Sequence, residues 1–167
     1  KTQSTIRYYT FVEMFDFLQD AWAEKTLQDY LPIYEGQAGD GPNQKSAVPH
    51  APYTVSKSLF EKINELNQSK ASSPQTISIH NQETPDEDQL FQTGHSAFND
   101  FFKAFDIPID DFQSTGQNSI YYALANMDPQ HRTLFVHNTM TEAADIQAAQ
   151  QWAGDRVFWA TCPNANL

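Results

Sequence analysis

The sequence predicts an α/β fold in which parallel strands alternate with helices. Short segments rich in β-branched and aromatic residues, such as Thr76–His80 and Arg132–His137, are typical of strands. Segments with apolar residues at intervals of three or four lie between them, and these intervals are typical of amphipathic helices. Because parallel strands need a long crossover connection, which is usually a helix, this alternation favours a parallel sheet.

Strands and helix ends can be placed along the whole chain. The strand-like segments are residues 6–11, 47–50, 76–80, 132–137 and 156–160. A first helix is expected up to about residue 30 from four spaced apolar side chains, Phe11, Phe15, Leu18 and Trp22. Ser58, Thr84 and Thr141 are typical N-cap residues and predict the starts of three later helices, the last of which ends at Gly154. A further helix is expected over residues 118–127.

Alternation along a strand predicts which side chains share a face. In the third strand, the two isoleucines face one way and His80 faces the other. In the fourth strand, Phe135 is expected on the same face as His137, whereas Leu134 and Val136 are expected to pack beneath the helices.

Two architectures agree with this alternation, and the residues alone leave both open. A doubly wound open sheet could be completed by 167 residues, whereas a (β/α)8 barrel typically needs about 250 and would be incomplete. The chain starts at Lys1 without a methionine and stops at Leu167 directly after the last expected strand. We therefore expect a single α/β domain over residues 1–167 that is a fragment of a larger protein, with a helical insertion over residues 84–130.

Composition excludes several classes of function. Ten Lys and Arg residues stand against 21 Asp and Glu residues, so the net charge of −11 repels phosphate backbones and anionic lipids. Binding to nucleic acid or to a membrane surface is therefore not expected, and no apolar run reaches the roughly 20 residues of a membrane-spanning helix. The single cysteine, Cys162, excludes an internal disulfide and fits a reducing, cytoplasmic compartment.

Three histidines fall where parallel α/β folds form active sites. His50, His80 and His137 each end a different one of three consecutive expected strands. The carboxyl ends of parallel strands meet on one face of the sheet, so we expect the three imidazoles to converge there. A structural hydrogen-bonding role is usual for one such histidine, but three in register favour function. His95 and His131 lack this placement and are expected to face solvent.

Glu83 lies three residues after His80, just before a predicted helix whose free N–H groups favour an ionised carboxylate. Neutral imidazole is the commonest metal ligand, and a zinc-bound water can have a pKa near about 7. A carboxylate beside such a water can transfer its proton to a leaving nitrogen. The combination suggests metal-assisted hydrolysis, and the alternative is that Glu83 only complements the charge of the helix end.

Four segments resemble motifs of the amidohydrolase superfamily, in the branch that holds chlorotriazine hydrolases, methylthioadenosine/adenosylhomocysteine deaminases and guanine deaminases. His50–Ser56 resembles the HAPYTxS segment of this branch, and Ile79–Thr84 resembles its strand-five HxxET motif. Val136–Asn138 is similar to the strand-six histidine, and Cys162–Leu167 is similar to the turn after strand seven. The motifs occur in the family's order and together span residues 50–167.

The resemblance implies a distorted (β/α)8 barrel, of which this chain covers roughly strands three to seven, and one divalent metal, Zn²⁺ or Fe²⁺. It implies that His80 binds the metal and that Glu83 shuttles the proton. It also implies that His137 polarises the water or the substrate and that His50 contacts a small-molecule substrate. The family's strand-one His-x-His pair and strand-eight Asp do not occur in this sequence. We therefore expect the isolated chain to bind metal weakly and to be inactive, and we expect its open strand edges to promote a homo-oligomer.

The leading interpretation is thus a metal-dependent hydrolase or deaminase that acts on non-peptide C–N bonds of a heterocycle or cyclic amidine. One alternative within the superfamily is a cyclic amide hydrolase of the imidazolonepropionase type. An alternative from another class is a non-catalytic α/β binding or interaction module, in which the histidines are structural.

Overall fold

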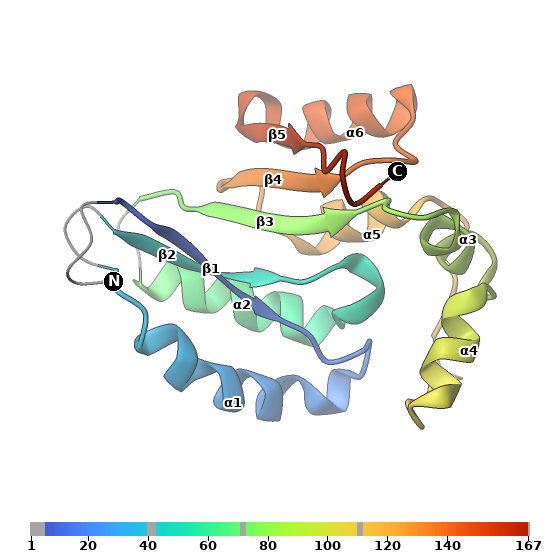
Figure 1. The fold of residues 1–167 in the computed structure, drawn as a ribbon, viewed down its shortest axis with the longest axis horizontal. Helices are drawn as coiled ribbons and strands as arrows, with labels where there is room; N and C mark the ends of the chain where they lie inside the picture. Colours follow the sequence, from blue (N-terminus) through green and yellow to red (C-terminus); the bar gives the residue numbers. More distant parts are fainter. Residues whose placement is uncertain (1–5, 40–42, 71–72, 110–111, 167) are drawn as a thin grey trace.

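The computed structural model describes residues 6–39, 43–70, 73–109 and 112–166 (Figure 1). Its strands are β1 (Tyr9–Met14), β2 (Gln44–Pro49), β3 (Thr76–Asn81), β4 (Arg132–His137) and β5 (Val157–Ala160). Its α-helices are α1 (Ala23–Glu35), α2 (Lys57–Lys70), α3 (Pro85–Thr93), α4 (Ala97–Ala104), α5 (Ser119–Asn126) and α6 (Ala143–Ala153). Short 3₁₀ turns cover Asp20–Trp22, Pro52–Thr54 and Gly154–Arg156. The predicted alternation of strands and helices is confirmed.

The strands lie side by side in chain order, and every pair is parallel (Figure 1). β1 pairs with β2, and β3 pairs with β4 and β4 with β5. β2 and β3 are joined at their starts by a hydrogen bond of 2.7 Å from the Ser46 hydroxyl to the Thr76 carbonyl. They are joined at their ends by one of 2.9 Å from the His80 N–H to the His50 carbonyl. In a doubly wound sheet, the strand order reverses at a switch point. The order of the described strands does not reverse.

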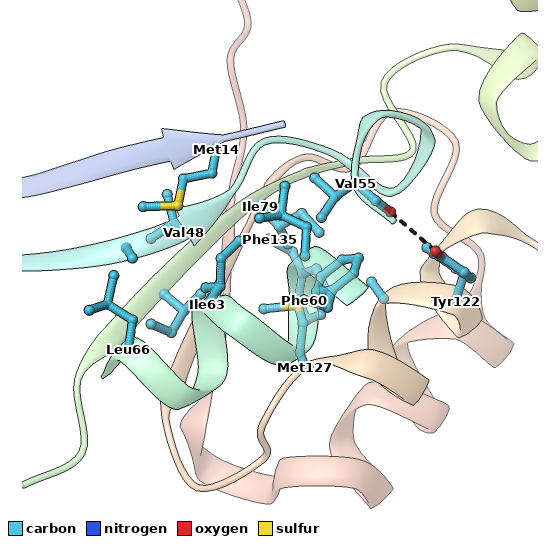
Figure 2. Packing of buried hydrophobic residues seen from close by; sticks show 14 of the residues in the cluster. Met14, Val48, Val55, Phe60, Ile63, Leu66, Ile79, Tyr122, Met127 and Phe135 are labelled. Atoms are coloured by element: carbon cyan, nitrogen blue, oxygen red, sulfur yellow. Dashed lines mark hydrogen bonds between the residues drawn. The ribbon is translucent and has the colours of Figure 1, made fainter. Parts of the chain in front are cut away.

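One apolar core lies between the strands and the helices that connect them (Figure 2). Strand residues such as Met14, Val48 and Ile79 meet Phe60 and Ile63 of α2 there. A hydrogen bond of 3.1 Å from the Tyr122 hydroxyl to the Val55 carbonyl closes one end of the core (Figure 2). Burial of one such large apolar side chain stabilises the fold by about 1.5–3 kcal/mol, so this layer fixes the strands from which the site projects.

The first strand begins at Tyr9 rather than at Ile6, and it continues through the start of the predicted helix. Val12 and Met14 are buried by strand alternation, and the backbone then turns at Phe17 and Leu18, where φ is +54° and +64°. A left-handed backbone cannot continue a right-handed helix, so the helix starts later, at Ala23. The predicted helical spacing was wrong because a strand, a turn and a 3₁₀ segment happened to place apolar residues at helical intervals.

Two helix starts also differ from the prediction. α2 is capped by Ser56, whose hydroxyl accepts the Leu59 N–H at 3.1 Å, and not by Ser58. α6 is capped by Glu142 rather than by Thr141, although it ends at Gly154 as predicted. Glu142 has the extended backbone that an N-cap requires, and Ser56 makes the capping hydrogen bond; the sequence pattern specifies neither feature.

The face predicted for β4 is wrong. Phe135 is fully buried in the core, whereas Leu134 and Val136 are only half-buried. Phe135 lies opposite Ile79 in the parallel register, and residues paired in this way point to the same face. The register between two strands depends on long-range packing, so alternation within one strand could not identify the buried face.

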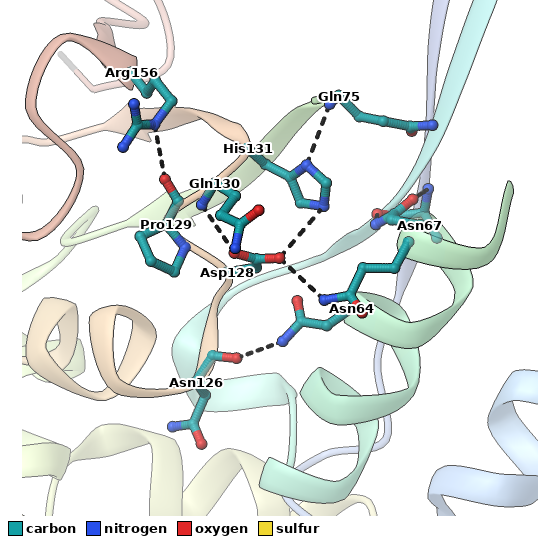
Figure 3. Close-up of polar contacts among 11 residues, drawn as sticks. Asn64, Asn67, Gln75, Asn126, Asp128, Pro129, Gln130, His131 and Arg156 are labelled. Atoms are coloured by element: carbon teal, nitrogen blue, oxygen red, sulfur yellow. Dashed lines mark hydrogen bonds and ion pairs between the residues drawn. The ribbon is translucent and has the colours of Figure 1, made fainter. Parts of the chain in front are cut away.

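His131 is buried, which contradicts its predicted exposure, whereas His95 is exposed as expected. The Gln75 N–H donates to His131 Nδ1 at 3.2 Å, and Asp128 Oδ2 lies 3.9 Å from Nε2 (Figure 3). Burial lowers the pKa of this imidazole. His131 therefore belongs to a polar cluster beside the start of β4 that links α2 to the loop before β4 (Figure 3).

None of the helices in the described ranges has both the length and the apolar character needed to cross a membrane.

Candidate site at the carboxyl ends of the strands

The three strand-end histidines lie together. The ring centroids of His50 and His80 are 4.8 Å apart, with the rings perpendicular, and those of His80 and His137 are 5.2 Å apart. His50 directly follows β2, His80 is the last residue but one of β3, and His137 ends β4. The structure thus brings together the histidines that the sequence placed at one rim of the sheet.

His50 is held through both its backbone and its ring. Its N–H donates to the Met14 carbonyl at 3.1 Å, and its carbonyl accepts the His80 N–H. Its Nδ1 lies 2.8 Å from the Thr54 hydroxyl oxygen, which in turn donates its proton to the Ala51 carbonyl at 3.2 Å. In the tautomer that carries its proton on Nδ1, the hydroxyl oxygen accepts from Nδ1–H and Nε2 carries the lone pair. Burial, and secondly the charge of His80, lower the pKa of His50 and favour the neutral imidazole.

His137 reaches the rim through an unusual backbone. Its φ is +78° and that of Asn138 is +60°, both in the left-handed region that non-glycine residues rarely adopt. The Asn138 amide holds this turn by donating to the carbonyls of Phe135 at 2.9 Å and Ala160 at 3.0 Å. Its oxygen accepts from the Asn81 amide at 3.1 Å. The turn breaks the strand alternation, and it lets His137 meet His80 although Phe135 faces the core.

Two carboxylates lie beside these imidazoles. Glu83 Oε1 is 3.5 Å from His137 Nδ1, and the Asn166 side-chain oxygen is 3.1 Å from the same nitrogen. Glu13 Oε1 is 3.7 Å from His80 Nε2. Glu83 was a sequence candidate, but Glu13 was missed as one. The sequence did carry a signal for Glu13, because a strand over this segment alternates Glu13 with Val12 and Met14, which are buried. The helix predicted over the same residues obscured this alternation.

Aromatic side chains border the site on the side of His50. The rings of Phe15 and Tyr53 lie 5.7 Å and 6.2 Å from the His50 ring, both edge-on. Tyr53 also stacks on Phe98 of α4 at 4.3 Å, with 17° between the ring planes. Burial, followed by the charges of Glu87 and Glu83, raises the pKa of Tyr53 to about 12, so its hydroxyl stays protonated at neutral pH.

The described residues do not fit a complete metal site. In ranges 6–39, 43–70, 73–109 and 112–166, no group of three or more His, Cys, Asp or Glu side chains is arranged to hold a metal ion. The rings of His80 and His137 lie 5.2 Å apart, but a tight zinc site needs three or four donors. Two cavities of about 390 and 480 Å³ lie elsewhere, and neither is lined by any of the predicted site residues.

Asp16 ties the loop after β1 to the segment that orients His50. Its side chain is buried and accepts from the Ser56 N–H at 2.7 Å and from the Ser56 hydroxyl at 2.5 Å. Its own N–H donates to the carbonyl of Thr54, the residue that holds the His50 ring, at 3.0 Å. Burial raises the pKa of Asp16 to about 6.

We expect Asp16 to make the fold less stable as the pH rises. Its pKa in the folded chain, about 6, exceeds the unfolded value of about 3.9, so its contribution is complete below about pH 4 and is lost as the pH passes about 6. Asp16→Asn should remove this dependence. In urea unfolding, the variant should gain about 2 kcal/mol over the wild type between pH 4 and pH 7.5. The exposed Asp155→Asn is the control, and equal pH profiles for Asp16→Asn and wild type would contradict the assignment.

Fold and site together define a parallel α/β protein with imidazoles and carboxylates gathered at the carboxyl ends of its strands.

No family model and no curated protein matches the sequence. Solved structures do match it in fold. Aminofutalosine deaminase from Helicobacter pylori superposes with a TM-score of 0.79 at 18% identity, covering 99% of this chain and 39% of the deaminase. Its complex with methylthio-coformycin gives a TM-score of 0.74 at 18% identity, over 99% and 38% of the two chains.

An adenosine deaminase from Xanthomonas campestris with bound zinc superposes with a TM-score of 0.61 at 20% identity, over 96% of this chain and 31% of that one. The chain therefore has the fold of a part of these deaminases, and it spans less than two fifths of their length. This likeness agrees with the amidohydrolase resemblance at the level of the fold. It gives no support to the chlorotriazine-hydrolase branch in particular.

Proposed function

We propose that the chain is part of a metal-dependent hydrolase that removes an amino group from, or cleaves a related C–N bond in, a heterocyclic or cyclic amidine substrate. The observation that carries the proposal is the meeting of His50, His80, His137 and Glu83 at the ends of three consecutive parallel strands. The fold likeness to three deaminase structures supports it. In this proposal, the described strands are strands three to seven of a (β/α)8 barrel.

Each side chain has a role that its surroundings favour. His80 would supply one ligand to a Zn²⁺ or Fe²⁺ ion whose other ligands lie outside this sequence, and such an ion supplies Lewis-acid chemistry. Glu83 would carry a proton to the leaving nitrogen, because a carboxylate 3.5 Å from an imidazole can exchange protons without a large movement. His137, held by Asn166, would polarise the reacting group, and His50 with its proton on Nδ1 would accept a hydrogen bond from the substrate through Nε2.

The helices between β3 and β4 would form the insertion over residues 84–130, of which residues 110–111 lie outside the described ranges. Through Phe98, α4 brings an aromatic ring to Tyr53 at the border of the site. β1 and β5 are the end strands of the described order, so the remaining barrel strands or a second copy of the chain would cover their edges.

The experiment compares the protein expressed from its complete gene with the 167-residue chain. We expect the complete protein to hold one divalent metal and to release ammonia from at least one member of a panel of aminopurines, aminopyrimidines and aminotriazines. We expect the 167-residue chain to hold no stoichiometric metal. Metal content is measured by elemental analysis and ammonia by a coupled assay.

Three outcomes would overturn the proposal or part of it. Tight stoichiometric zinc in the 167-residue chain would contradict the division of the ligands. Ring opening without ammonia release would favour the cyclic amide hydrolase instead. A complete protein that holds no metal and transforms none of the compounds would favour the non-catalytic binding module.

A further inference from the structure

A buried glutamine lies between two of the site residues. Gln82 follows β3, between His80 and Glu83, and it is fully buried with a left-handed φ of +46°. Its amide nitrogen donates to Asp88 Oδ2 at 3.0 Å and to Asp145 Oδ2 at 2.9 Å. Its side-chain oxygen accepts from the Asn81 amide at 3.2 Å and from the Thr141 hydroxyl at 2.8 Å, so both ends of this amide are bonded inside the protein.

Glu87 of α3 binds the turn after β3 that contains Gln82 and Glu83. Its side chain is fully buried, and its Oε1 accepts the Gln82 N–H at 2.9 Å and the Ser119 hydroxyl at 2.7 Å. Its Oε2 accepts the Glu83 N–H at 3.1 Å. One carboxylate thus fixes two successive backbone N–H groups, the second of which belongs to Glu83.

These contacts are not an ordinary helix cap. A glutamate at the third helical position usually bonds to the N–H of the N-cap residue, which here is Thr84. Glu87 instead bonds to the two residues before Thr84, which lie in the turn and outside the helix. Burial of carboxylates costs free energy, and burial raises the pKa of Glu87 to about 7. A polar N-cap would satisfy the helix without this cost, so helix stability alone does not account for Glu87.

The same turn is bound to the loop that carries His137. The Gln82 carbonyl accepts the Met140 N–H at 3.0 Å, and its side-chain oxygen accepts the Thr141 hydroxyl at 2.8 Å. The Asn138 N–H donates to the Asn81 carbonyl at 3.0 Å. The segments after β3 and β4 therefore form one hydrogen-bonded unit, with Gln82 at its centre.

We infer that Glu87 is a positioning residue, which holds the backbone of Glu83 so that its carboxylate faces His137. Gln82 extends the same constraint to the His137 loop. The inference rests on the proposed role of Glu83 as a proton carrier, but its geometric part concerns only this chain. Without Glu87, the Glu83 N–H loses its acceptor, and the side chain loses its fixed distance of 3.5 Å from His137 Nδ1.

The first test uses Glu87→Gln in the 167-residue chain, studied by NMR at pH 8. A glutamine keeps the shape but presents an NH₂ group to one of the donors, so at least one of the two N–H bonds must break. We expect amide exchange at Gln82 or Glu83 to become at least about tenfold faster, which corresponds to about 1.4 kcal/mol. The His137 ring signals should move in the direction that Glu83→Gln also produces. Asp86→Asn is the control, since it changes a carboxylate to an amide in the same helical turn without touching Gln82 or Glu83.

The second test uses Glu87→Gln in the complete protein. We expect kcat to fall at least about tenfold, the factor that about 1.4 kcal/mol produces, with KM unchanged and Asp86→Asn normal. If Glu87→Gln does not fold, Glu87→Asp replaces it, because a side chain one methylene shorter cannot reach both N–H groups. A folded variant with unchanged exchange and unchanged His137 signals would overturn the inference. A complete protein without hydrolase activity would instead refute the proposed function, while the NMR result would still decide the geometry.

Discussion

Glu83→Gln in the complete protein is expected to lower turnover by about 10²–10⁴-fold, the usual contribution of a positioned acid–base group. The amide is close in shape and hydrogen-bonding reach to the carboxylate, but it cannot take up and release a proton at neutral pH. Its oxygen can still lie near His137 Nδ1, from which Glu83 Oε1 is 3.5 Å away. Substrate binding and metal content should therefore change little, and the loss should appear in kcat.

Steady-state kinetics and elemental analysis on the same preparation check this result. Glu61→Gln is the matched control, because it makes the same chemical change at an exposed position of α2. A variant that loses its metal together with its activity would indicate that Glu83 supports the metal ligands rather than the proton. Unchanged turnover would remove Glu83 from the mechanism altogether.

The convergence of the histidines could be predicted from the sequence because it depends on a local pattern and one topological rule. The strict alternation around Ile77 and Ile79 located β3, and the predicted and observed bounds of β4 coincide at Arg132 and His137. Once strands are known to be parallel, their carboxyl ends must meet at one rim. No knowledge of the packing was needed for this step.

Several parts of the site could not be predicted because they depend on contacts between distant residues. Glu87 bonds to Ser119, 32 positions away, and Gln82 bonds to Asp145, 63 positions away. The left-handed backbone of His137 is likewise held by neighbours on β3 and β5 rather than by its own propensity. Polar residues that the sequence pattern would place on the surface are therefore buried, and they support the turns at the carboxyl ends of the strands.

The error at β4 has the same origin, and it has a large thermodynamic consequence. Alternation alone placed Phe135 beside His137 at the site, but the parallel register places it against Ile79 in the core. Its ring stacks on Trp159 at 5.1 Å, with 27° between the planes. Because the surrounding strands and helices cannot fully close the space, Phe135→Ala is expected to destabilise the fold by about 3–5 kcal/mol.

Urea unfolding of the 167-residue chain measures this loss, which is a large part of the about 5–15 kcal/mol that stabilises a typical domain. Phe105→Ala makes the same change at a side chain that is 65% exposed, and it should alter the free energy of unfolding by less than about 0.5 kcal/mol. If Phe135→Ala were as mild as Phe105→Ala, Phe135 would lie on the open face of the sheet. The left-handed turn at His137 would then not be needed to bring its ring to His80, and the site would have to be rebuilt from simple strand alternation.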